Sequence, residues 1–205
     1  MKILMNNMIV TDIVSLDNKK GKVYIDGKYA FPLYLGEIRR YNIEVGQVVL
    51  NSTLDEINDV LYKRIRERAL YLLESMPRTE YNLRRKLLEN HYTEEYIEPV
   101  IERLKDYGFV NDLQYAQDYA KNMRDNRGMS KKMIISKLYE KGVPREIIHE
   151  VIMEFSDDET ELVEKALKKK GLTMNELVEL EPREKQRVYR YLLNKGFSAS
   201  CINMY

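Results

Sequence analysis

The sequence has few residues of several types that particular protein classes need. It contains one cysteine, Cys201, and no tryptophan among its 205 residues. One thiol excludes an internal disulfide framework and is typical of a reducing compartment. No apolar run is long enough to cross a bilayer, and the segment 1–7 lacks the apolar core of a signal peptide. We therefore expect a soluble, cytoplasmic protein that makes no contact with a membrane.

Net charge is almost absent as well. The chain has 34 lysines and arginines and 33 aspartates and glutamates, which leaves a formal charge of +1. With 33 % charged and 44 % hydrophobic residues, it has the composition of a folded protein and not of a disordered one. The balance argues against the strongly basic class of nucleic-acid-binding proteins. Any affinity for nucleic acid must therefore come from local basic patches.

Residues with catalytic or metal-binding chemistry do not form a recognisable set. The two histidines, His91 and His149, are far apart in the sequence, and neither has another histidine or a cysteine at the spacing of metal ligands. No glycine-rich phosphate-binding loop occurs. Cys201 would need a nearby histidine to act as a nucleophile, and its place in the repeat described below is that of a packing residue. We expect no enzymatic activity, no metal and no cofactor.

One sequence pattern occurs three times. Three ten-residue segments, which begin at Leu83, Ile134 and Val188, read LRRKLLENHY, IISKLYEKGV and VYRYLLNKGF. Their central leucines lie 51 (138 − 87) and 54 (192 − 138) residues apart. A period of about fifty residues is typical of repeat proteins, in which each unit buries its apolar face against its neighbours. We expect an elongated array, whose long surface suits a large partner better than a small substrate.

The first fifty residues have a different pattern and predict a small β-rich module over 1–51. Strands are expected on both sides of Asp26-Gly27, because this pair tolerates the positive φ angles of a tight hairpin turn. The expected strands cover 9–16, 23–25, 29–31 and 45–50, and a short helix is expected over 36–42.

Helical spacing of apolar residues follows this module. A long helix is expected over 54–76, with Thr53 and Glu56 as a capping box at its start. Three repeats of three helices are then predicted, over 52–108, 109–155 and 156–205, with the long helix as the first helix of the first repeat. The expected helix caps in these repeats are Thr93, Asp112, Ser130, Thr173 and Ser198. The fold class is therefore mainly α: tandem three-helix repeats in an elongated array, preceded by a small β-rich N-terminal module.

The middle of the chain resembles the RecX family of regulatory proteins. The string Gly108-Phe-Val-Asn-Asp112-Leu-Gln-Tyr-Ala, followed by Arg127-Gly128 and Lys141-Gly142-Val143, is similar to the central signature of that family. Arg78-Thr-Glu80-Tyr-Asn-Leu83 resembles its first-repeat motif. The likeness is good over 60–155 and loose over the third repeat. In the first repeat, Asn90-His91 stands where a Lys-Gly pair is more usual.

This resemblance implies a regulator of RecA, the recombinase that polymerises on single-stranded DNA. RecX proteins bind in the helical groove of the RecA filament and modulate, usually by inhibition, its ATP hydrolysis, strand exchange and repressor cleavage. The implied partner is thus the RecA filament, and the protein is expected to act as a monomer. Two alternatives remain open from the residues alone. One is a helical module that binds single- or double-stranded DNA directly, and the other is a protein-interaction scaffold with a different partner.

Two basic segments contain the candidate residues for binding a partner or DNA. Segment 121–145 has eight basic and two acidic residues, and segment 62–86 has eight basic and three acidic residues. An ordinary solvated helix face is the alternative explanation for both. The candidate residues are Arg124, Arg127, Lys131, Lys132, Lys137, Arg78, Arg84 and Arg85.

The sharpest candidate within these segments is the stretch from Arg127 to Lys132. A glycine break and a serine cap there leave backbone N–H groups and two lysines at a helix start, which suits an anion. Reversal of the charges of Arg127, Lys131 and Lys132 is expected to abolish regulation and to leave the helical content unchanged.

Overall fold

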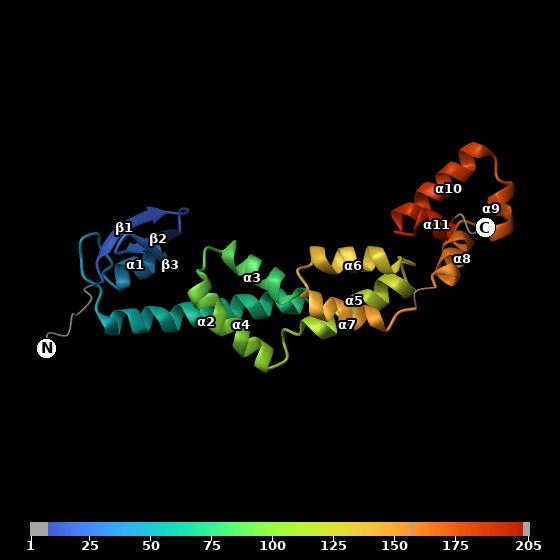
Figure 1. Cartoon of the computed structure of the whole chain (residues 1–205). Helices are drawn as coiled ribbons and strands as arrows, with labels where there is room; N and C mark the ends of the chain where they lie inside the picture. The colour runs from blue at the N-terminus through green and yellow to red at the C-terminus, as the bar shows by residue number, and fades with distance from the viewer. Residues whose placement is uncertain (1–7, 157, 203–205) are drawn as a thin grey trace. The chain divides into compact units, whose positions relative to one another are not determined.

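The computed structural model describes residues 8–156 and 158–202, which form two compact units. Unit 1 contains the chain up to Pro77 together with Leu83–Val110, and unit 2 contains Arg78–Asn82 together with the chain from Asn111 onward. The described residues form three strands and eleven helices (Figure 1). The predicted fold class, mainly α with a small N-terminal β-sheet, is confirmed.

The β-sheet of unit 1 is antiparallel, in the order β1-β2-β3. Its strands are β1 (Val10–Ser15), β2 (Lys20–Ile25) and β3 (Lys28–Tyr34), and the short helix α1 (Leu35–Arg40) packs against β2 and β3. Asp26 and Gly27 form the predicted turn, with φ angles of 50° and 77°. The predicted strand over 45–50 is wrong. Gly46 turns the backbone with a φ of 88°, and the segment makes one isolated bridge, between Val48 and Ile9.

The long helix α2 (Asn51–Ser75) forms the core of unit 1. Its buried residues recur every three or four positions and form one stripe: Leu54, Ile57, Leu61, Ile65, Ala69 and Leu72. The predicted capping box is wrong, because Leu50 is the extended residue before the helix and Thr53 lies inside the first turn. Helices α3 (Glu80–Leu88) and α4 (Glu94–Asp106) complete the first repeat. Tyr96 of α4 donates a hydrogen bond to Asn58 of α2 at 2.6 Å.

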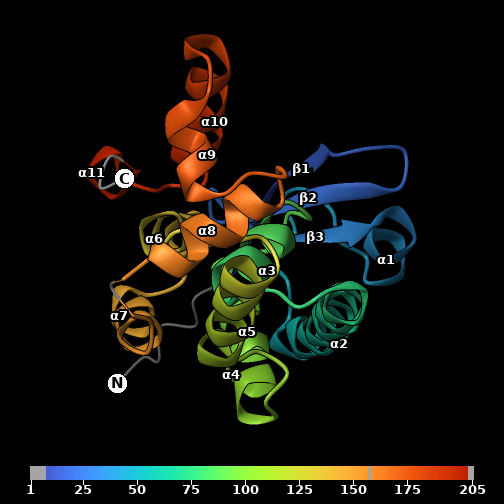
Figure 2. The same cartoon turned by 90° about the vertical axis from the view of Figure 1, so that its right-hand side faces the viewer.

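Unit 2 contains the second and third repeats. The second has α5 (Asp112–Asp125), α6 (Lys131–Glu140) and α7 (Arg145–Met153), which contact one another. The third has α8 (Thr160–Lys168), α9 (Met174–Glu179), α10 (Pro182–Asn194) and α11 (Ala199–Ile202). The short helix α9 packs beside α10 (Figure 2).

Most of the predicted helix caps occur in these repeats. Ser130 accepts the backbone N–H of Met133 at 3.1 Å, Thr173 and Glu176 form a capping box, and Ser198 accepts the N–H of Cys201 at 3.0 Å. Thr93 is at the N-cap position of α4 but makes no side-chain cap bond. The prediction for Asp112 is wrong by one residue.

Asn111 caps α5 instead, because its side chain accepts the N–H of Gln114. The Asp112 carboxylate is used elsewhere and accepts the N–H of Glu80 at 2.8 Å.

Successive repeats join at a recurring contact within unit 2. The Thr79 hydroxyl donates to the carbonyl oxygen of Lys141 at 2.7 Å, and the N–H of Ser130 donates to the carbonyl oxygen of Lys195 at 2.9 Å. Thr79 and Ser130 are equivalent, since each precedes the second helix of its repeat, and both are fully buried. The Lys-Gly turn of one repeat therefore docks on the cap of the repeat before it.

Glycine is required at this joint for two reasons. Gly142 and Gly196 follow the two lysines and have φ angles of 75° and 91°, which favour glycine. A Cβ atom on Gly142 would overlap Tyr81, and one on Gly196 would overlap Ser130. Side-chain bulk at either turn would thus separate the repeats.

The first repeat has no repeat before it, and its turn departs from the pattern. His91 occupies the position of the two glycines and has a φ of 68°. Its carbonyl oxygen accepts a hydrogen bond from the Tyr29 hydroxyl of β3. The β-sheet therefore supplies the contact that a preceding repeat supplies elsewhere, and no close packing at this turn requires glycine.

Buried and half-buried tyrosines should make unit 1 sensitive to alkaline pH. Burial raises the pKa of Tyr29, Tyr92 and Tyr96 above the ordinary value of about 10. The folded state thus favours the neutral phenols. Their contribution to stability is complete below about pH 10 and is lost as the pH rises above it. We expect these tyrosines to ionise together with loss of helical circular dichroism. Ionisation of all sixteen tyrosines at constant circular dichroism would contradict this.

Candidate partner-binding site

Unit 2 has a hollow of about 280 Å³ where its second and third repeats meet. We call it the basic hollow, because six of the side chains that line it are cationic: Arg124, Arg127, Lys165, Lys168, Lys169 and Lys195. Among the described residues, Asp125 is the one acid of its lining. Leu162 and Ala166 of α8 supply apolar surface. The hollow is therefore suited to an anionic group.

Helix geometry explains why cations gather there. Helix α8 buries Leu162, Val163, Ala166 and Leu167, so its lysines project from the opposite side and from its last turn. The carboxyl end of α5 carries backbone carbonyls without helical partners, which attract cations. Lys169 donates to the carbonyl oxygen of Asn126 at 2.9 Å, and Lys195 donates to that of Arg127.

The cations of the hollow are not fully compensated. Burial, together with the positive charge of Lys169, holds the pKa of Lys195 below its ordinary value. Arg124 lies with its guanidinium carbon 4.9 Å from the ring centroid of Phe155, which holds the side chain in place. Its buried Nη1 has no hydrogen-bond partner among the described residues. A bound anion would reduce the repulsion between Lys169 and Lys195 and would accept a hydrogen bond from Arg124 Nη1.

The predicted anion site at the start of α6 holds a carboxylate of the same chain. The N–H of Lys131 donates to the carboxylate of Glu159, so an acid of the same chain already occupies this helix end. The ammonium group of Lys131 donates to the carbonyl oxygen of Phe155 at 3.3 Å. Lys132 is exposed beside it.

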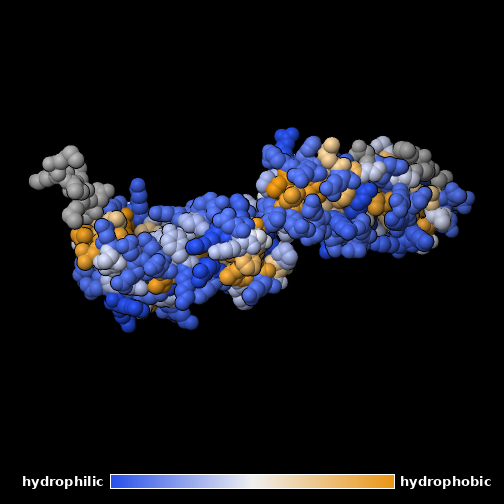
Figure 3. All heavy atoms as spheres, turned by 90° about the horizontal axis from the view of Figure 1, so that it is seen from below, coloured by the Kyte–Doolittle hydropathy of each residue, from blue (hydrophilic) through white to orange (hydrophobic). Residues whose placement is uncertain are grey.

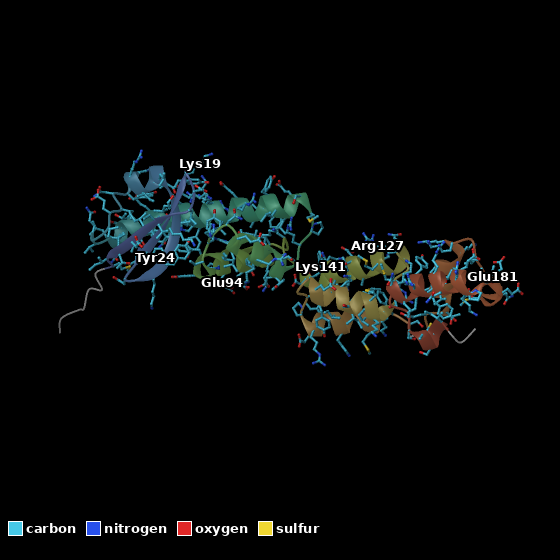
Figure 4. All side chains as sticks on the ribbon, turned by 90° about the horizontal axis from the view of Figure 1, so that it is seen from above. Lys19, Tyr24, Glu94, Arg127, Lys141 and Glu181 are labelled. Atoms are coloured by element: carbon cyan, nitrogen blue, oxygen red, sulfur yellow. The ribbon has the colours of Figure 1, made fainter. Side chains whose placement is uncertain are left out.

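Lys137 lies further along α6 and pairs with Glu140 at 2.8 Å, and that hydrogen bond raises the pKa of Lys137. Of the candidates in segment 121–145, the basic hollow thus brings together Arg124 and Arg127. In Figure 4, Arg127 lies at the end of the second repeat that faces the third repeat, and Lys141 lies at its other end.

The candidates of segment 62–86 differ in their surroundings. Arg84 is bound by Glu94 at 2.6 Å and by Glu98 at 2.5 Å, so it holds α3 to α4. Arg85 lies 3.8 Å from Glu89 on an exposed surface. Arg78 is half-buried and belongs to unit 2, whereas Arg84 and Arg85 belong to unit 1.

Four cations of the basic hollow were missed by the sequence reasoning: Lys165, Lys168, Lys169 and Lys195. A signal existed, because Lys168 to Lys170 is a run of three lysines and Lys195 belongs to the third copy of the repeat. A count of charges within one segment could not predict that these lysines lie beside Arg127, because they come from another repeat.

Two further properties concern the whole described chain. None of the helices over 8–156 and 158–202 combines the length and the apolarity of a membrane span. Over the same residues, no three or more histidine, cysteine, aspartate or glutamate side chains are grouped so that they could hold a metal ion.

The chain is similar to proteins of one family along nearly its whole length. Models of the first, second and third three-helix domains of RecX match residues 66–104, 111–152 and 157–205. Regulatory protein RecX of Clostridium acetobutylicum is 33 % identical over 97 % of this chain and 94 % of its own length. Regulatory protein RecX of Clostridium beijerinckii is 30 % identical over 97 % of this chain and 93 % of its own length.

Solved structures agree with these matches. A crystal structure of regulatory protein RecX covers 96 % of this chain and 98 % of its own, with a TM-score of 0.60 and 25 % identity. The crystal structure of RecX from Lactobacillus salivarius covers 71 % of this chain and 94 % of its own, with a TM-score of 0.58 and 27 % identity. Three consecutive domain models and relatives of at least 30 % identity show that this chain belongs to the RecX family of regulatory proteins.

Proposed function

We propose that this protein binds the RecA–single-stranded DNA filament in the cytoplasm and inhibits its recombinase, ATPase and coprotease activities. It acts as a monomer and catalyses no reaction itself. The single observation that supports this most is the presence of three consecutive RecX domains. The fold agrees with the proposal, because the second and third repeats meet within unit 2 and form a surface there that suits a large partner.

The basic hollow is the part of this surface that we assign to the filament. A filament on DNA presents phosphates. The six cations of the hollow, of which Lys165 pairs with Glu161 at 2.6 Å, outnumber the acids beside them and are complementary to phosphates. An anion at this position would accept a hydrogen bond from the unpaired donor of Arg124 and would stabilise the charged form of Lys195, whose pKa is lowered. The same hollow also supports direct binding to naked DNA, which is the second candidate function.

The experiment adds the purified protein to a preformed RecA filament on single-stranded DNA and follows ATP hydrolysis. Inhibition at about one protein per few RecA subunits supports the proposal, and no effect at stoichiometric amounts contradicts it. Tight binding to naked DNA that weakens steeply with salt, without any effect on RecA, would favour the DNA-binding function instead. Gel filtration with light scattering tests the monomer.

A further inference from the structure

Unit 1 has a groove of about 870 Å³ between α2 and α4. Its lining along α2 includes Asp59, Lys63, Arg66 and Leu70, which are spaced by four, three and four residues and therefore lie on one face of the helix. This stretch spans about 16 Å at 1.5 Å per residue. The groove thus has the length of about three helical turns.

The floor and one end of the groove are apolar. Tyr62, Leu70, Val100 and Leu104 contribute to the lining between the two helices. Tyr107 and Phe109 stand at the end of α4 with 66 % and 57 % of their surface exposed. Hydrophobic surface on the visible face of the protein gathers in separate patches within a largely hydrophilic surface (Figure 3). Exposed aromatic rings beside an apolar groove are typical of an interaction site.

The backbone holds Phe109 at a defined position. Helix α4 ends at Asp106, and Gly108 reverses the chain with a φ of 74°. The N–H of Gly108 donates to Lys105 at 2.8 Å, and the N–H of Phe109 donates to Leu104 at 2.9 Å. The backbone at Phe109 is therefore already ordered in the free protein. Binding of a partner to the ring would cost little conformational entropy at this residue.

Three cations line the groove without an internal partner. Lys63, Arg66 and Arg103 are exposed and form no ion pair among the described residues. Other cations of the same repeat are neutralised, since Arg84 binds two glutamates and Lys105 binds Glu102 at 2.9 Å. The groove thus keeps a net positive charge, with Asp59 as its acid among the described residues.

We propose that this groove binds an acidic, amphipathic helix of a partner protein. Its apolar side chains would enter between α2 and α4, and its carboxylates would pair with Lys63, Arg66 and Arg103. A helix in a groove of this length presents apolar residues at positions i, i+3, i+4 and i+7. Nucleic acid fits the groove less well, because three of the four floor side chains, Leu70, Val100 and Leu104, are aliphatic and offer no ring on which a base could stack.

The probe is a fluorescein-labelled fourteen-residue peptide with leucine or phenylalanine at i, i+3, i+4 and i+7 and glutamate at the other positions. We expect its fluorescence anisotropy to rise with full-length protein. The double variant R66E/R103E should weaken binding about tenfold or more. Phe109→Ser, which keeps the charge, should also weaken it. The matched control K28E/R39E reverses two exposed cations of the same unit outside the groove and should bind the peptide like the unmodified protein.

Several outcomes would overturn the proposal. These are equal weakening in R66E/R103E and in K28E/R39E, equal binding of a peptide with lysine in place of glutamate, and no binding of the acidic peptide at all. Binding of oligo-dT that is lost in R66E/R103E, while the peptide does not bind, would make the groove a nucleic-acid site. Thermal denaturation of each variant checks the fold. The result is independent of the RecA experiment, because the peptide assay contains neither RecA nor DNA.

Discussion

Replacing Gly142 with alanine should destabilise unit 2 by about 3 kcal/mol. A left-handed backbone costs a residue with a Cβ atom roughly 1–2 kcal/mol. The new Cβ would also overlap Cβ, Cγ and Cδ1 of Tyr81, and the Cβ atom of Tyr81 cannot move without the start of α3. The loss is measured by urea denaturation of the full-length protein, followed by circular dichroism.

The matched control is Gly171→Ala. Gly171 has nearly the same φ, 72°, but no atom lies within 4 Å of its hypothetical Cβ. It should therefore lose about 1 kcal/mol, from backbone strain alone. Gly196→Ala, whose Cβ would overlap Ser130, should behave like Gly142→Ala. Equal losses of stability in Gly142→Ala and Gly171→Ala would contradict the prediction. They would show that backbone strain alone accounts for the cost and that packing against Tyr81 adds nothing.

The first repeat has a residue with a Cβ atom, His91, at the position equivalent to Gly142. His91 has the same backbone conformation as Gly142, but the β-sheet reaches its carbonyl oxygen and no repeat docks on it. The repeat found by aligning the leucines thus includes the turn after each second helix. Close packing requires glycine at this turn in the second and third repeats but not in the first. The departure Asn90-His91 is a consequence of standing first in the array and does not weaken the family resemblance.

Local elements could be predicted from the sequence because their causes act over a few residues. The Asp26-Gly27 turn, the Ser130 cap and the capping box that begins at Thr173 each depend on groups within four residues. The start of α2 could not be located in this way. Leu50 has no capping side chain, and packing of the following stripe decides where the helix begins.

The candidate site was predicted in part, because its members come from two repeats. Lys169 reaches a carbonyl group 43 residues earlier in the chain, and Lys195 reaches one 68 residues earlier. Arg84 of segment 62–86 is unavailable for the opposite reason, since Glu94 and Glu98 from another helix neutralise it. Charge runs report which residues are basic, whereas the packing of helices decides which of them remain available.

The basic hollow leads to the prediction with the largest effect on function. The double variant R127E/K168E should raise the concentration that half-inhibits RecA ATP hydrolysis by about one to two orders of magnitude. Both side chains line the hollow and are exposed, and neither makes a hydrogen bond or ion pair through its charged group among the described residues. Reversal of two cations changes the local charge by four, so attraction of an anion turns into repulsion.

The matched control for this variant is K121E/K132E, which makes the same charge change in segment 121–145 outside the hollow. It should retain inhibition within about threefold, because neither side chain lines the hollow and salt partly screens charges on an exposed surface. Equal loss in both variants would assign binding to the basic segment as a whole.

The fold gives this prediction a second readout. Arg127 and Lys168 lie among other cations, so their reversal removes repulsion within the hollow. The reversal also places a glutamate at the carboxyl end of α8, which costs the helix a small amount of stability. We therefore expect the melting temperature of R127E/K168E to fall by no more than this small cost. Loss of inhibition with an intact fold would show that the cations gather for a partner. Loss of inhibition together with early unfolding would show instead that they hold the third repeat against the second.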